Sequence, residues 1–293
     1  MTAPFIHALI ADLKTTGHHR TAETYLAALN AFLRFRQGDD IPLSQITPAI
    51  IRQFESWLAN KGICQNTSSF YMRILRAAYN RAVKQGLTPD RKPFRDVYTG
   101  VKKTIKRAIP LKTIKRMHQL NLKKEPQLEF ARDVFILSFM LRGMSFIDMC
   151  LLKKSQLKGD TLTYRRQKTG QPLTIRITPQ INRIIQKYPT NPTERLLPIL
   201  TRQSKNIRSA YRNKSAQINA ALKQLMPRLG LSQPLTLYVA RHSWASAAQS
   251  KGIQINTISQ AMGHDSIKTT QIYLQTLSHE TIDRANDLIL SAL

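Results

Sequence analysis

The spacing of hydrophobic and polar positions predicts helices throughout the first hundred residues. Between residues 21 and 36, apolar side chains recur at Tyr25, Leu29 and Phe32, a spacing that places them on one helical face. Gly86 is a residue type that commonly ends helices, and it follows the last helical pattern of this region. The expected helices cover residues 3–13, 21–36, 49–60 and a fourth that begins at Asn66 or Thr67 and ends near Gln85.

The third of these helices has the clearest start signal. Thr47 is a favourable N-cap, and Pro48 occupies the first helical position, where its missing N–H has no cost. Together the four segments predict a compact helical unit. None of them contains a constellation of catalytic side chains.

The pattern changes beyond residue 110 to a mixed but mainly helical one. Residues 161–164 and 173–177 alternate with a period of two and predict a small antiparallel sheet, with Lys168 in the turn between them. The apolar run from Val134 to Leu141 is too short to span a bilayer and indicates a buried helix. Helices are expected at residues 126–141, 179–187, 204–225, 236–249, 255–262, 266–275 and 278–290.

The last of these helices, Ser278 to Leu290, has an apolar face that must be buried somewhere. Ile282, Ala285 and Ile289 fall on one side of it at helical spacing. The pattern leaves two interpretations open, namely burial against the chain's own core and docking on a neighbouring copy of the chain.

Composition adds a large positive charge to this picture. The 293 residues, enough for two domains, include 45 Lys and Arg against 17 Asp and Glu, a formal charge of +28. Such an excess favours a nucleic-acid partner over a generally basic surface, and no membrane partner is expected. The first ten residues do not resemble a secretory signal, and two cysteines are too few for a disulfide framework, so a reducing cytoplasm is the expected location.

The positive charge is densest where the helical unit ends. Residues 99–124 hold nine Lys and Arg and no acid, and their first part has the composition of a linker. A solvated tether would explain this run, but a segment that crosses DNA would release counterions there. We therefore expect a helical DNA-binding domain at 1–98, a basic linker at 99–110 and a second domain at 111–293. The linker residues expected to contact DNA are Lys102, Lys103, Lys106 and Arg107.

Five residues of the second domain could form one phosphoryl-transfer site. Arg142 and Arg241 could bind a phosphate, Lys168 and His264 could move protons, and Tyr273 could attack phosphorus. Each alone has a plain structural interpretation, such as a helix-end cation, a turn lysine or a core tyrosine. The chain shows no metal-ligand spacing and no nucleotide-binding glycine motif, so no metal or cofactor is expected.

The order of these five residues resembles the catalytic domain of the tyrosine recombinases, the phage-integrase and Xer-type family. The resemblance covers residues 108–293 and is most specific in MGHDSIKTTQIYL, where His264 precedes Tyr273 by nine residues. The first hundred residues resemble the core-binding, SAM-like domain of that family more weakly. The resemblance implies a mainly helical protein with a small antiparallel sheet in its catalytic domain.

The resemblance also implies a role for each residue. Tyr273 would be the nucleophile, Arg142 and Arg241 would hold the scissile phosphate, Lys168 would protonate the leaving 5′-oxygen, and His264 would support the phosphate. Where the family has a histidine three residues before the second arginine, this chain has a tyrosine. That tyrosine is Tyr238, and His242 could partly compensate for the missing histidine. Arg165, Arg166 and His242 are expected to contact DNA.

The implied reaction is strand exchange in double-stranded DNA, through a 3′-phosphotyrosyl link and a Holliday junction held by a tetramer. The outcome could be integration, excision or inversion of a mobile element. A type IB topoisomerase shares the chemistry, and a non-catalytic DNA-binding protein could share the scaffold, so both stay open. The expected location is the cytoplasm, in association with the nucleoid.

Overall fold

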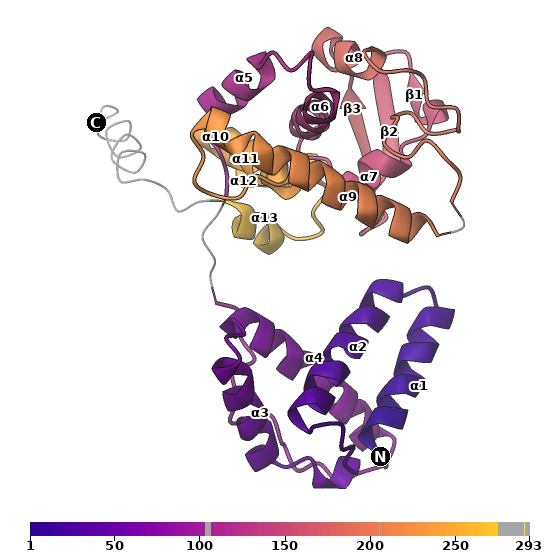
Figure 1. Cartoon of the computed structure of the whole chain (residues 1–293), viewed down its shortest axis with the longest axis vertical. Coiled ribbons are helices and arrows are strands. Elements are labelled where there is room, and N and C mark those ends of the chain that lie inside the picture. Colours follow the sequence, from indigo (N-terminus) through magenta and orange to yellow (C-terminus); the bar gives the residue numbers. More distant parts are fainter. Residues whose placement is uncertain (103–106, 205, 275–289, 291–293) are drawn as a thin grey trace. The chain divides into compact units, whose positions relative to one another are not determined.

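A computed structural model describes residues 1–102, 107–204, 206–274 and 290, with Ile272 and Tyr273 described by their backbone only. The contacts divide the chain into two compact units, Met1–Thr104 and Ile105–Leu293. Both are mainly helical, and the second contains a small antiparallel sheet, which confirms the expected fold class (Figure 1). None of the helices in the described part of the chain has the length and apolar character that crossing a membrane requires.

The first unit consists of four helices that match the predicted segments closely. Thr47 caps the third helix, since its side chain accepts a hydrogen bond from the N–H of Ile50 at 3.4 Å, and Pro48 is the first helical residue, as predicted. The helices are α1 (Thr2–Thr15), α2 (His19–Phe35), α3 (Pro48–Asn60) and α4 (Gln65–Lys84), with a short 3-10 helix, η1 (Leu43–Gln45).

The predicted start of α4 at Asn66 or Thr67 is wrong by one or two residues, because Cys64 occupies the N-cap position. Asn66 has another role. Its side-chain amide accepts a hydrogen bond from the N–H of Lys102 at 2.8 Å and donates one to the carbonyl oxygen of Lys102 at 2.9 Å. The amide therefore holds the incoming end of the basic segment against α4.

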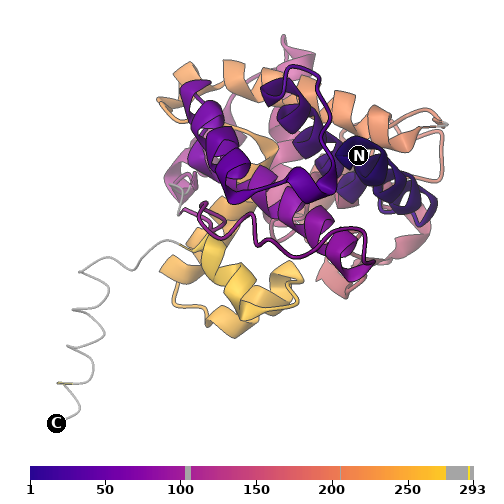
Figure 2. The same ribbon diagram turned by 90° about the horizontal axis from the view of Figure 1, so that it is seen from below.

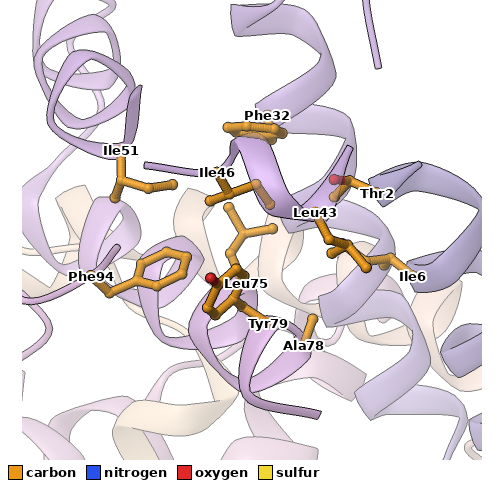
Figure 3. A pocket seen from close by; sticks show the side chains of 10 residues that line it. All are labelled: Thr2, Ile6, Phe32, Leu43, Ile46, Ile51, Leu75, Ala78, Tyr79 and Phe94. Atoms are coloured by element: carbon orange, nitrogen blue, oxygen red, sulfur yellow. The ribbon is translucent and has the colours of Figure 1, made fainter. Parts of the chain in front are cut away.

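Aromatic side chains fill the core of the first unit. Phe54 is fully buried and meets Phe32 edge-to-face at 5.3 Å, while Trp57 stacks on it at 6.2 Å. A cavity of about 10 Å³ lies in this core between Phe32 and Tyr79, and Figure 3 shows the mostly apolar side chains around it. A cavity of that size is at the limit for a single water, so it is a packing gap and not a ligand site.

The second unit is built around α6 (Pro126–Met140), which is buried on nearly all sides and packs against α5, α8, α9 and α11. This confirms the buried helix expected from the apolar run. The remaining helices are α5 (Leu111–Gln119), α7 (Phe146–Leu151), α8 (Pro179–Gln186), α9 (Ile207–Gln224), α10 (Met226–Leu229), α11 (Leu237–Ser250), α12 (Ile255–Met262) and α13 (Ile267–Tyr273), with the 3-10 helix η2 (Lys154–Gln156).

One buried carboxylate ties α6 to the end of α8. Asp133 accepts hydrogen bonds from Arg132 at 2.7 Å, from Lys187 at 2.6 Å and from the hydroxyl of Tyr188 at 2.7 Å. Burial alone would raise the pKa of Asp133, but these three donors outweigh it and lower the pKa. The charge on α6 is thus compensated inside the unit, which keeps the helix compatible with full burial.

The sheet has three antiparallel strands in the order β1 (Leu157–Lys158), β2 (Thr161–Arg165) and β3 (Pro172–Arg176). The predicted hairpin is confirmed, and Thr163 pairs with Thr174 in its middle, with their hydroxyl oxygens 3.2 Å apart. The hairpin turn therefore lies between Arg165 and Pro172, and Lys168 is on it.

Candidate active site

The predicted site residues come from four separate parts of the second unit. Arg142 follows α6, Lys168 lies on the β2–β3 turn, Arg241 lies on α11, and His264 joins α12 to α13. The helices α11, α12 and α13 pack against one another, and Figure 2 shows α12 and α13 as one compact group in yellow. Tyr273 is the last residue of α13.

Arg241 is the centre of this arrangement and is only 4 % exposed. Its Nη1 donates to the carbonyl oxygen of Gly143 at 2.8 Å, and its Nη2 donates to the carbonyl oxygen of Met262 at 2.8 Å. Nη2 also lies 2.7 Å from Nε2 of His264. Two carbonyl oxygens and an imidazole nitrogen, all of them neutral acceptors, thus take hydrogen bonds from this buried guanidinium group.

The turn after α6 has an unusual backbone that makes the Gly143 contact possible. Arg142 and Gly143 both have positive φ angles, 60° and 70°. A side chain on Gly143 would place its Cβ 2.9 Å from the Cα of Arg241, so only glycine allows this approach. Arg142 itself is a non-glycine residue in the left-handed region, a conformation that is uncommon and often found at functional sites.

Arg142 keeps a half-exposed guanidinium group. Within the described part of the chain, no protein oxygen hydrogen-bonds that group. The alternative that Asp148 holds Arg142 in an ion pair is not what the structure has, because Asp148 faces Arg166, with the Nε of Arg166 3.8 Å from its Oδ2. Arg142 is therefore a cation placed near Arg241 by the Gly143 turn and available to a bound anion.

His264 is buried, 8 % exposed, and its two ring nitrogens have different neighbours. Nε2 faces Arg241, and Nδ1 lies 2.8 Å from the hydroxyl oxygen of Thr270. Burial lowers the pKa of His264 to about 4, and three nearby cations act in the same direction. These cations are Arg241, Arg166 and Lys168. The imidazole is therefore neutral at neutral pH.

The turn that carries Lys168 is anchored by Asp148 and Arg166. Oδ1 of Asp148 accepts the backbone N–H of Gln167 at 2.9 Å, directly before Lys168. Arg166 is 7 % exposed and its Nη1 donates to the carbonyl oxygen of Gly263, so its guanidinium group is used inside the protein. Lys168 is exposed at the tip of the turn. Lys168, the candidate general acid, thus lies on a turn that Arg166 attaches to Gly263, the residue before His264.

The other predicted residues differ in their exposure and contacts. Tyr238 is 57 % exposed, and its ring meets His242, 9 % exposed, edge-to-face at 4.7 Å. Arg165 is exposed and donates to the carbonyl oxygen of Gly170 at 3.1 Å. Lys102 and Arg107 are exposed, whereas Lys103, Lys106, the side chain of Tyr273 and the predicted terminal helix up to residue 289 lie outside the described residues.

The sequence did not predict the structural role that three residues have in this site. Thr270 and Asp148 were not candidates, and Arg166 was expected on the surface. A buried polar side chain on an otherwise apolar helix face is a weak signal that could have suggested Thr270. In the described part of the chain, no group of three or more His, Cys, Asp or Glu side chains is placed to hold a metal ion.

Comparisons with known proteins show which families the two parts of the chain match. Residues 2–105 match the model of the phage integrase SAM-like domain, and residues 112–280 match that of the phage integrase family. A tyrosine recombinase of Pseudothermotoga lettingae is 21 % identical over 92 % of this chain and 92 % of its own length. Tyrosine recombinase XerC of Pediococcus pentosaceus is 25 % identical over 87 % of this chain and 86 % of its own.

Solved structures show the same fold. A lambda integrase fragment, in a dimer bound to a COC′ core site, matches with a TM-score of 0.72 at 18 % identity, over 92 % of this chain and 94 % of that one. A lambda integrase tetramer bound to a Holliday junction matches with a TM-score of 0.66 at 18 % identity, over 86 % of this chain and 72 % of that one.

Replacing Gly143 by alanine should destabilise the second unit more than the same change at Gly159. Both glycines have positive φ angles, 70° and 60°, so an added Cβ brings backbone strain of about 1–2 kcal/mol at either position. Only at Gly143 would the Cβ meet the Arg241 backbone, whereas nothing lies within 4 Å at Gly159. Thermal unfolding of Gly143→Ala and Gly159→Ala measures the difference, and equal melting temperatures would contradict it.

The low pKa of His264 predicts a specific loss of stability in acid. Its ordinary value is 6.5 and its folded value is about 4, so between these the unfolded chain binds the proton more tightly. The stability that neutral His264 contributes is present above pH 6.5 and is lost as the pH falls towards 4. Thermal unfolding at pH 7 and pH 5 should show a larger drop in the wild type than in His264→Gln. Parallel drops would show that His264 titrates normally.

Proposed function

Because the chain belongs to the phage integrase family, we propose that it is a site-specific recombinase, which cuts and rejoins DNA strands through a tyrosine. The observation that carries this proposal is the buried Arg241, bound to His264 and two carbonyl oxygens beside a half-exposed Arg142. Two guanidinium groups, one buried and one half-exposed, supply positive charge that suits an oxyanion that gains charge during reaction.

In this proposal Tyr273 attacks a backbone phosphate in line, forming a 3′-phosphotyrosyl link and releasing a 5′-oxygen. Lys168 gives a proton to that oxygen, and its exposed place on the anchored turn supports contact with bound DNA. Arg142 and Arg241 hold the non-bridging oxygens. The phosphodiester energy is conserved in the protein–DNA bond, so rejoining requires no nucleotide hydrolysis: the 5′-hydroxyl of a partner strand attacks the link and frees Tyr273.

The proton of Tyr273 needs an acceptor, and we assign this role to His242, which partly compensates for the family's missing histidine. Tyr238 stands where the family has a histidine, and a phenol with an ordinary pKa near 10 is a poor base at neutral pH. Its exposure and its edge-to-face contact with His242 support a role in contacting the phosphate, with His242 holding its ring.

The DNA partner follows from the charge and the family. The chain carries a formal charge of +28, and the solved integrases of the same fold are bound to DNA. We assign DNA binding to residues 1–98 and catalysis to residues 111–293, with the basic segment 99–110 between them. The lambda integrase tetramer on a Holliday junction supports a tetramer as the working form. The reaction would take place in the cytoplasm on nucleoid DNA. The family match favours recombination over a topoisomerase.

Tyr273→Phe should bind DNA with unchanged affinity and form no covalent complex, because the phenol oxygen is the proposed nucleophile. A nicked suicide substrate traps the adduct, and a denaturing gel detects it. Tyr238→Phe is the matched control, since it removes the other candidate phenol and should still form the adduct at a reduced rate. A persistent adduct in Tyr273→Phe would exclude this residue as the nucleophile, and no adduct in the wild type would favour a non-catalytic protein.

Lys168→Ala should cleave slowly, and a substrate whose leaving 5′-oxygen is replaced by sulfur should restore its rate. A thiolate leaves without protonation, so the substrate makes a general acid unnecessary. Arg142→Ala is the control, because loss of phosphate binding should not be rescued by sulfur and should lower the rate by about 10² to 10³ on either substrate. Failure of the sulfur substrate to rescue Lys168→Ala would leave Lys168 as a binding residue.

A further inference from the structure

Thr270 is a fully buried polar residue on α13, and its only described side-chain partner is His264. Its relative exposure is 0 %, and its hydroxyl oxygen lies 2.8 Å from Nδ1 of His264. It precedes Tyr273 by three residues, so less than one helical turn separates them. A buried hydroxyl requires a hydrogen bond, and here that bond reaches the site.

The direction of the hydrogen bonds follows from the chemistry of their ends. A guanidinium group has five N–H donors and no acceptor, so Nε2 of His264 must accept from Nη2 of Arg241. The neutral imidazole then carries its hydrogen on Nδ1 and donates it to the oxygen of Thr270. The opposite tautomer would place an N–H of His264 against an N–H of Arg241 at 2.7 Å.

We propose that Thr270 is a positioning residue, which holds His264 in the Nδ1–H tautomer so that Nε2 accepts from Arg241. The hydrogen bonds join α13, the helix that ends in Tyr273, to the guanidinium group that binds the phosphate. The packing of α13 and the orientation of the Arg241 side chain are then coupled through His264. This inference rests on the proposed function, because it uses the proposed roles of Arg241 and Tyr273. His264 then contributes by orienting Arg241.

The neighbouring contacts support this coupling. The segment between α12 and α13 supplies two of the Arg241 acceptors, the carbonyl oxygen of Met262 and the ring of His264. The Thr270 contact adds a side-chain link to the packing of α13 against α11 and α12. The charged groups around the imidazole are Arg241 on α11 and Arg166 and Lys168 at the β2–β3 turn, all of which favour its neutral form.

Thr270→Val tests the proposal, because it keeps the branched shape and removes the hydroxyl. At saturating protein, single-turnover cleavage should slow by about 10-fold to 100-fold, the effect of losing an orienting partner at metal-bound histidines. DNA affinity should be unchanged, and Thr270→Ser should restore most of the rate. Thr269→Val is the matched control, since Thr269 is the adjacent threonine, half-buried, and should keep the wild-type rate.

A spectroscopic measurement separates orientation from a general structural effect. In protein labelled with ¹⁵N-histidine, long-range proton–nitrogen spectra should show His264 as the Nδ1–H tautomer in the wild type and in Thr270→Ser. In Thr270→Val the Nδ1–H group loses its acceptor, so the ring should turn away from Arg241, and the Nε2–H form, no longer opposed by the guanidinium group, should become more populated. His264→Gln identifies the signal of His264. An unchanged tautomer in Thr270→Val, or a threonine effect that persists in the His264→Gln background, would overturn the proposal.

Arg241→Ala distinguishes failure of this inference from failure of the proposed function. If Arg241→Ala cleaves normally, the proposed phosphate role is wrong and the coupling fails with it. If Arg241→Ala loses cleavage while Thr270→Val keeps the full rate, the proposed function stands and the positioning role of Thr270 is overturned. Thermal melting of each variant confirms that the rates compare folded proteins.

Discussion

The hydrogen bonds of one buried guanidinium group hold the catalytic unit in its working arrangement. Arg241 reaches the carbonyl oxygens of Gly143 and Met262 and the ring of His264, so it joins the turn after α6 to the α12–α13 segment. A buried charge is costly unless its donors are satisfied. The two carbonyl oxygens and the imidazole ring hold the guanidinium group in a fixed position, and a fixed positive group is what electrostatic preorganisation around a phosphate requires.

This constraint accounts for the backbone on either side of it. Gly143 has a positive φ angle and no side chain because the Arg241 backbone lies against it. Gly263, with a φ of 65°, faces Arg166, whose Cδ would be 2.6 Å from an added Cβ. Arg166 in turn donates to the carbonyl oxygen of Gly263 and lies near Asp148. The turn that carries Lys168 is therefore attached to the segment between α12 and α13. In the proposed function, the two buried arginines thus align the phosphate-binding candidates with the Lys168 turn through one short stretch of chain.

In the proposed function, the reaction depends on how α13 meets this stretch. Its residue Thr270 meets His264, and the nucleophile candidate Tyr273 is at its end. The pKa of His264 is about 4, so the ring is unprotonated at neutral pH. It therefore orients Arg241 and Thr270 through hydrogen bonds and adds no charge to the site. The chemistry required of such a site is positioning and stabilisation of added charge, and each of these contacts serves that requirement.

The sequence by itself determined the helical character, the hairpin that carries Lys168 and the residue types of the site. These follow from local signals: the apolar period of α2 and α6, the Thr47 cap, and the period-two strands. Only the tertiary structure decided that Arg166 points inward, that Asp148 serves Arg166 and the Gln167 amide, and that Thr270 meets His264. Arg166 and Gly263 are 97 positions apart, and Arg241 and Gly143 are 98 apart. A periodic pattern reports which face of a helix is buried, whereas the partner of a buried polar group depends on which distant segment packing brings within about 3 Å.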